Sequence, residues 1–91
     1  MNNQKKILVL CTGNSCRSIM AEGLINHFGK DYFQAFSAGS NPEGFVHQMS
    51  IKTLKKSGIL KSDYKSQSWD EFSDMDFDLV ITVCDNELKR N

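Results

Sequence analysis

The chain has 91 residues, which is enough for one small domain. Its 11 basic and 11 acidic residues give a formal net charge of zero, and this balance argues against a nucleic-acid binder, which would show a basic excess. No apolar stretch approaches the roughly 20 residues that span a bilayer, and the N-terminal residues do not form a secretory signal. We therefore expect a cytoplasmic protein with neither a membrane nor a nucleic acid as partner.

The first half of the chain is expected to form a strand, a helix and a second strand. The apolar run 7–10 predicts a strand that is buried on both faces. A polar loop follows, and then an amphipathic helix that Gly29 ends. The expected apolar face of this helix comprises Met20, Leu24 and Phe28, with Ala21 and Ile25 beside them. Residues 32–36 predict the second strand, which the turn-forming residues 37–42 end.

The second half is expected to contain a helix, a short turn and a strand. The helix would run from residue 44 or 45 to residue 57, with Gly58 as its stop. Its weaker apolar face comprises Val46, Met49 and Leu54. Ser68 and Glu71 have the spacing of a capping box and predict the start of a short turn or helix. The core residues expected in it are Trp69 and Phe72. The β-rich run 79–83 predicts the last strand.

This alternation of strands and helices predicts an α/β fold with a parallel sheet that is covered on both sides. In such sheets, ligands bind at the carboxyl ends of the strands. Cys11 and Cys84 each follow directly after a predicted strand. If those two strands are neighbours, both thiols lie in one crevice although they are far apart in the sequence.

The cysteine content indicates reduced thiols in a chain without a secretory signal. An odd number of cysteines, here Cys11, Cys16 and Cys84, does not suggest a framework of structural disulfides. Neither His27 nor His47 has a zinc-site spacing to a cysteine, so we expect no metal. We interpret His47 as a surface or loop histidine.

The loop after the first strand combines a cysteine, small polar residues and an arginine that opens a helix. Backbone N–H groups ahead of a helix form a concavity that binds anions. Gly13 allows a sharp turn, and Asn14 tolerates a left-handed conformation while its side chain ties the loop together. Arg17 offers a planar fork for two oxygens of a tetrahedral anion. In this field the thiolate form of Cys11 is favoured, which makes it a nucleophile, and Ser18 is placed to donate to its sulfur.

The expected anion-binding residues are therefore Thr12, Gly13, Asn14, Ser15, Cys16, Arg17 and Ser18. The structural alternative is that Cys11 only packs at the end of a strand and that Arg17 begins a solvated helix, since the spacing C-x5-R has many false matches. The strand before the loop, the helix after it, and the glycine and asparagine within it favour the functional interpretation. We interpret Cys16 as a small filler that points away from the anion, with a role as redox partner as the alternative.

Three blocks of the sequence resemble the low-molecular-weight tyrosine phosphatase superfamily. Residues 11–18 (CTGNSCRS), followed by residues 20–23 (MAEG), resemble its signature, and the T-G-N-S wording is that of the thioredoxin-coupled arsenate reductase branch. Residues 37–42 (SAGSNP) resemble the second block of the family. Residues 78–86 (DLVITVCDN) resemble the third block in its arsenate reductase form.

The resemblance implies a three-layer sandwich with a short parallel sheet and a thiol-based reaction. Cys11 would attack arsenate, or a phosphate monoester, that is held by the loop amides and Arg17. In the reductase branch, Cys84 would then attack Cys11, which forms a disulfide and releases arsenite. The reaction would use no bound cofactor, and an external thiol reductant such as thioredoxin would restore the thiols.

Relative to the family, residues 1–91 are expected to form a single but incomplete domain. The fourth strand, the final helix, a third relay cysteine and the Asp-Pro loop with the phosphatase general acid would be missing; Pro42 follows Asn41 instead. A phosphotyrosine-type hydrolase, which needs that acid, is one alternative function. A non-catalytic form that binds oxyanions or dimerises is another, because the strand 79–83 would present an uncovered edge for a homodimer.

Overall fold

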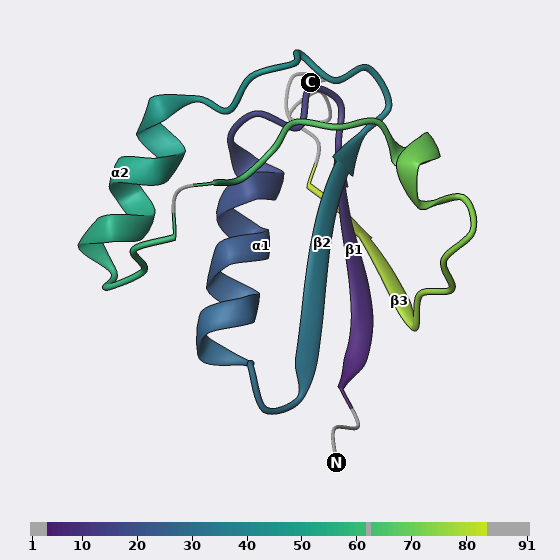
Figure 1. Ribbon diagram of the computed structural model, residues 1–91, viewed down its shortest axis with the longest axis horizontal. Coiled ribbons are helices and arrows are strands. Elements are labelled where there is room, and N and C mark those ends of the chain that lie inside the picture. Colours follow the sequence, from purple (N-terminus) through teal and green to yellow (C-terminus); the bar gives the residue numbers. More distant parts are fainter. Residues whose placement is uncertain (1–3, 62, 84–91) are drawn as a thin grey trace, which may run out of the picture.

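The computed structural model describes residues 4–61 and 63–83. In chain order these form β1 (Lys5–Cys11), α1 (Arg17–Phe28), β2 (Phe33–Gly39), α2 (Gln48–Lys56), the 3-10 helix η1 (Trp69–Phe72) and β3 (Leu79–Thr82). The three strands form a parallel sheet in the order β2-β1-β3, which Figure 1 shows with β1 in the middle. The predicted α/β class with a short parallel sheet is therefore confirmed.

One face of the sheet packs against α1 (Figure 1). The buried side chains at the centre of this contact are Ile7, Val9 and Ala35, and Ala21 and Ile25 of α1 pack against them. These three strand residues share a face because side chains alternate along a strand and Ile7 pairs with Ala35. The continuous apolar run in β1 thus supplies the core, as its sequence indicates.

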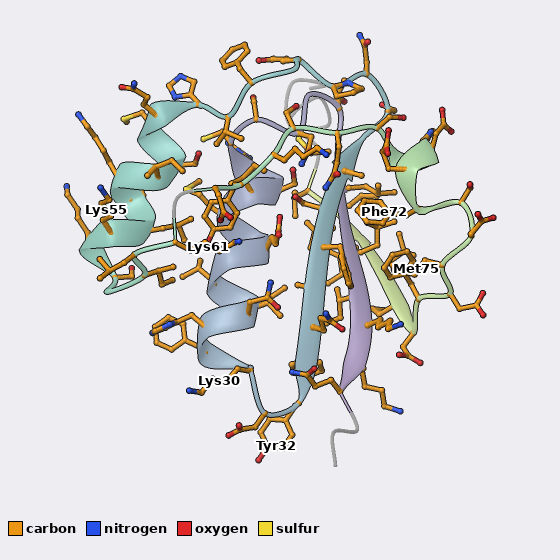
Figure 2. All side chains as sticks on the ribbon, viewed as in Figure 1. Lys30, Tyr32, Lys55, Lys61, Phe72 and Met75 are labelled. Atoms are coloured by element: carbon orange, nitrogen blue, oxygen red, sulfur yellow. The ribbon has the colours of Figure 1, made fainter. Side chains whose placement is uncertain are left out.

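The opposite face is covered by aromatic side chains, so the sheet is covered on both sides as predicted, although these side chains do not come from an α-helix. Phe36 of β2 packs edge-on against Phe72 and Phe77, with ring centroids 5.6 Å apart in both pairs. Figure 2 shows Phe72 on the side of the sheet that faces away from α1. This cover is the segment of η1 and the loop that leads into β3, rather than a second helix.

The helix α2 packs against α1 instead of against the sheet (Figure 1). Leu54 of α2 is fully buried, and a Cβ on Gly23 of α1 would lie 2.9 Å from its methyl groups. The buried face of α1 accordingly includes Ile19 and Gly23, whereas Leu24 is 39% exposed and Phe28 is 71% exposed. The predicted apolar face was therefore wrong in these two positions, because the neighbours of α1 lie on other sides of the helix.

The ends of β2 and α2 differ from those predicted. Ser37, Ala38 and Gly39, expected in a turn, continue β2 because they pair in register with the last three residues of β1. The helix α2 begins at residue 48, later than expected, since Gly44 has a φ of +88° and His47 has an extended backbone. His47 is exposed, as expected, and its Nδ1 accepts a hydrogen bond from Met49 N at 3.1 Å, so it caps the helix.

The short helix η1 is also held differently from the prediction. Ser68 Oγ accepts from Asp70 N at 3.1 Å and not from Glu71, whose N–H already donates to the Ser68 carbonyl at 3.0 Å. Phe72 is partly buried in the aromatic cover, but Trp69 is 47% exposed and is not a core residue. The prediction for Trp69 was therefore wrong.

The strand β3 lies at the edge of the three-stranded sheet (Figure 1). Leu79 and Val80 are each about half exposed. Within residues 4–61 and 63–83, no helix is long and apolar enough to cross a bilayer.

Candidate active site

The carboxyl ends of β1 and β3 lie side by side. β3 pairs in parallel with β1 from Ile7↔Leu79 to Leu10↔Thr82, and Val83 N donates to the Leu10 carbonyl at 2.8 Å. The strands that precede the two candidate thiols are therefore neighbours, which is the condition on which the expected crevice with both thiols depends. Cys11 is the last residue of β1, while Cys84 lies outside the described residues.

A cavity of about 310 Å³ opens at the carboxyl end of β1. Its lining residues are Cys11, Thr12, Gly13, Ser15, Cys16, Arg17, Asn41 and Glu43. The structure thus brings the candidate nucleophile and the arginine to one cavity. Cys16, expected as a filler directed away from the anion, lines the cavity too, and both Cys11 and Cys16 are free, partly exposed thiols.

Four carbonyl groups of this loop accept hydrogen bonds from the segment that follows β2. Those of Cys11, Thr12, Gly13 and Ser15 accept hydrogen bonds of 2.8–3.3 Å from the amides of Ser40, Asn41, Glu43 and His47, respectively. Among the described residues, no protein group accepts a hydrogen bond from the amides of residues 13–16. Successive N–H donors in a loop where most carbonyls are already bonded are typical of the backbone concavities that bind anions.

The N-terminus of α1 adds to this positive field. The helix begins at Arg17, no side chain caps it, and its first turn contains no acidic residue. The first N–H groups of a helix lack partners within the helix, and its dipole places partial positive charge there. An anion in the cavity would therefore meet donors from both the loop and the helix.

The buried side chain of Asn14 stabilises the conformation of the loop. It is fully buried and has a φ of +48°, so Asn14 rather than Gly13 is the left-handed residue of the loop. Its Nδ2 donates to Ser18 Oγ at 2.7 Å, and its Oδ1 accepts from Gln67 N at 2.8 Å. Ser18 Oγ accepts this bond, so its hydroxyl proton is left for another acceptor. A bond from Ser18 to the sulfur of Cys11 stays a prediction.

Sequence reasoning missed the side chains that support the loop from distant segments. Ser66 Oγ donates to the Gly13 carbonyl at 3.2 Å. Ser50 Oγ donates to the His47 carbonyl at 2.6 Å and lies 3.4 Å from the Ser15 carbonyl. Glu43 also went unnoticed, although its side chain lies directly over the loop. A Cβ added to Gly13 would lie 2.9 Å from Glu43 Oε2. No local motif marked these residues, because they reach the loop only through the fold.

A smaller cavity of about 120 Å³ also has Cys11 in its lining. It is lined by Leu10, Cys11, Thr12, Ser40, Trp69 and Thr82. The half-exposed indole of Trp69 therefore borders the candidate nucleophile, which explains its position outside the core. Its neighbour Ser68 forms a bridge to Gly39 at the end of β2, and this bridge holds η1 at the carboxyl ends of the strands.

A partly buried carboxylate lies between α1 and β2. Ser37 Oγ donates to Glu22 Oε1 at 2.6 Å. Burial raises the pKa of Glu22, while this hydrogen bond and the positive charge of Lys61 lower it in part. Burial also raises the pKa of the neighbouring Tyr64, and the charge of Glu22 adds to the effect. Glu22 does not line the cavity around Cys11.

Comparison with known proteins gives a consistent result. The family model described as low molecular weight phosphotyrosine protein phosphatase matches residues 6–91. An arsenate reductase of Halalkalibacterium halodurans is 42% identical over 82 residues, which are 90% of this chain and 58% of that protein. An arsenate reductase of Bacillus subtilis is 40% identical over 80 residues, which are 88% of this chain and 57% of that protein. The chain thus spans less than two thirds of the length of these relatives.

Solved structures agree with the sequence comparison. A structure described as an arsenate reductase in the phosphate binding state has a TM-score of 0.81 and 34% identity, and the match covers 89% of this chain and 61% of that one. A low molecular weight protein tyrosine phosphatase from T. tengcongensis has a TM-score of 0.73 and 37% identity, with 87% and 58% covered. The fold, the loop and these matches together show that the chain belongs to the low molecular weight phosphotyrosine protein phosphatase family.

Proposed function

We propose that the loop after β1 binds a tetrahedral oxyanion and that Cys11 uses this site to reduce arsenate to arsenite. The main support is the cavity itself, in which Cys11 and Arg17 lie together with Gly13, Ser15 and Cys16. The amides of these three loop residues have no protein acceptor among the described residues. The relatives named as arsenate reductases support the choice of arsenate as substrate.

The first step would use the charge arrangement of the loop. The amides and the N-terminus of α1 carry partial positive charge, which holds the incoming anion. The guanidinium of Arg17 grips two oxygens of arsenate. The Cys11 sulfur then attacks arsenic, a sulfur–arsenic bond forms, and one arsenic–oxygen bond breaks as that oxygen accepts protons and leaves as water.

The second step would require another thiol, and we assign it to Cys84. The Cys84 thiolate attacks Cys11 Sγ, a disulfide forms, and the sulfur–arsenic bond breaks with its electron pair left on arsenic. Arsenate is thereby reduced by two electrons to arsenite while two thiols are oxidised. The parallel pairing of β1 and β3 supports this role, because Val83 is bonded to the strand that ends at Cys11. A dithiol protein such as thioredoxin would reduce the disulfide again.

Phosphomonoester hydrolysis is the second candidate. The family description and the similarity to a tyrosine phosphatase favour it, and the cavity beside Trp69 offers an apolar wall for an organic group. In this reaction Cys11 would displace the alcohol from phosphorus, and water would then release phosphate. A second thiol has no part in it, so Cys84 distinguishes the two reactions.

The two candidates are separated by assaying both reactions on three proteins: the unchanged chain, Cys11→Ser and Cys84→Ser. Arsenate with a dithiol reductant tests the reductase, and an aryl phosphate tests the hydrolase. We expect Cys11→Ser to abolish arsenite formation and Cys84→Ser to stop it after the attack on arsenate, with no Cys11–Cys84 disulfide in mass mapping. Turnover of the aryl phosphate that Cys84→Ser leaves intact, with no arsenite from the unchanged chain, would favour the hydrolase.

A further inference from the structure

Glu43 places a carboxylate in a cavity that otherwise favours negative charge. It lines the cavity together with Cys11 and Arg17, and its Oε2 lies where a Cβ on Gly13 would come within 2.9 Å. Among the described residues, its carboxylate forms no ion pair and no hydrogen bond. A carboxylate in this position lowers the affinity of the cavity for any anion that carries no proton. A ligand that binds here must therefore interact with the carboxylate in another way.

The backbone around Glu43 is fixed to the loop at two points. Glu43 N donates to the Gly13 carbonyl at 2.9 Å, and Gly44 N donates to Ser66 Oγ at 3.2 Å. Ser66 Oγ in turn donates to the same Gly13 carbonyl at 3.2 Å. The residue is therefore held against the loop by its main chain, and its side chain remains available to a ligand.

A carboxylate and an oxyanion attract each other only if a proton lies between them. Arsenate and phosphate retain at least one proton near neutral pH, and their hydroxyl group can donate to a carboxylate. Sulfate has the same shape but carries no proton under these conditions. A site with one carboxylate beside its donors therefore binds a protonated oxyanion more tightly than an unprotonated one, because the latter leaves two negative groups in contact.

We propose that Glu43 is a specificity-determining residue that accepts a hydrogen bond from the protonated oxygen of arsenate or phosphate and thereby favours these anions over sulfate. This inference rests on the proposed oxyanion site of the loop. The donors of that site bind three oxygens of any tetrahedral anion. The Glu43 carboxylate accepts a hydrogen bond from the remaining oxygen only when that oxygen carries a proton. Gly13 leaves room for this arrangement, since a Cβ there would lie 2.9 Å from Glu43 Oε2 and the carboxylate would have to shift.

The test measures how inorganic phosphate and sulfate protect Cys11 from alkylation by iodoacetamide, read at the Cys11 peptide by mass spectrometry. In the unchanged chain we expect phosphate to protect at a concentration about tenfold lower than sulfate. In Glu43→Gln, the ratio should approach unity because sulfate gains affinity. Glu71→Gln removes the same charge from the exposed surface of η1 and should leave the ratio unchanged.

The outcomes separate this inference from the proposed function. Equal protection by the two anions in the unchanged chain, or an equal gain for both in Glu43→Gln, would overturn the role of Glu43 and leave the oxyanion site standing. Failure of both anions to protect Cys11 in both proteins would overturn the oxyanion site as well. The backbone bonds that hold residue 43 persist in Glu43→Gln, so the substitution changes the charge and little else.

Discussion

The loop that follows Cys11 and the outer surface of α1 and β3 differ in the kinds of side chain that they bury and expose. Around the loop, polar side chains such as Asn14 and Ser18 are completely buried, and among the described residues no buried side-chain polar atom lacks a partner. On the outer surface, the large apolar side chains of Phe28 and Val80 are exposed. Burying polar groups costs stability unless every bond is made, whereas exposed apolar groups are seldom required by a fold. The comparison indicates that structural precision is concentrated where the anion would bind.

Among the substitutions that test this comparison, Asn14→Ala should have the largest effect on stability. The change leaves Gln67 N without its acceptor and places a residue with an ordinary side chain at a φ of +48°. We expect a loss of about 2–4 kcal/mol of unfolding free energy, measured by urea denaturation. Asn14→Gly keeps the backbone conformation and loses only the hydrogen bonds, so it should lose less. Equal stability of Asn14→Ala and the unchanged chain would contradict the role assigned to this side chain.

Arg17→Lys should weaken oxyanion binding without a comparable loss of stability. Lysine keeps the charge but cannot offer the planar fork that binds two oxygens. We expect the concentration of phosphate that protects Cys11 from alkylation to rise about tenfold. Lys55→Arg is the matched exchange on an exposed part of α2 (Figure 2) and should change nothing. Unaltered protection in Arg17→Lys would show that the arginine does not grip the anion.

The partly buried Glu22 should make the stability of the folded chain depend on pH. Its pKa is raised in the folded state, mainly by burial, so the folded chain binds its proton more tightly than the unfolded chain. The resulting stability is complete below the unfolded value of 4.5 and is lost as the pH rises through the folded value. Glu22→Gln stays neutral and should flatten this part of the stability curve in urea denaturation at several pH values. A decline that persists in Glu22→Gln would assign it to another group.

The smallest effect on stability is expected on the outer surface. Val80→Lys should change the unfolding free energy by no more than about 0.5 kcal/mol, because Val80 is half exposed. We also expect the unchanged chain to self-associate through β3, which lies at the edge of the described sheet, and Val80→Lys to reduce this association. Sedimentation measures both proteins, with Gln48→Lys as the control for added charge on α2. Monomers at all concentrations in the unchanged chain would contradict the prediction.

The sequence predicted the elements that depend on local pattern. The apolar run of β1 was sufficient to predict the strand, and the cysteine, asparagine and arginine after it were sufficient to predict a candidate anion site at the end of that strand. The apolar face of α1 was predicted less well, because periodicity identifies apolar residues but not the neighbours that bury them. Leu24 had the expected spacing, yet Gly23 is the residue that packs against α2.

The supports of the loop could not be predicted from local pattern at all. Ser66 and Gln67 contact residues that lie 53 positions earlier in the chain. Glu43 reaches the cavity only because the segment after β2 pairs its amides with the loop carbonyls. Such contacts depend on the path of the chain between elements, which single residues do not specify.

The central claim, that the amides of residues 13–16 bind a tetrahedral anion, can be measured directly. An isotope-labelled sample of the chain would be titrated with inorganic phosphate while the backbone N–H resonances are followed by NMR. The account predicts that the resonances of Gly13, Asn14, Ser15 and Cys16 shift together and saturate at one concentration, because these N–H groups have no protein acceptor among the described residues. If these four resonances stay in place while those of the lysine-bearing helix α2 move, phosphate binds elsewhere and the account is contradicted.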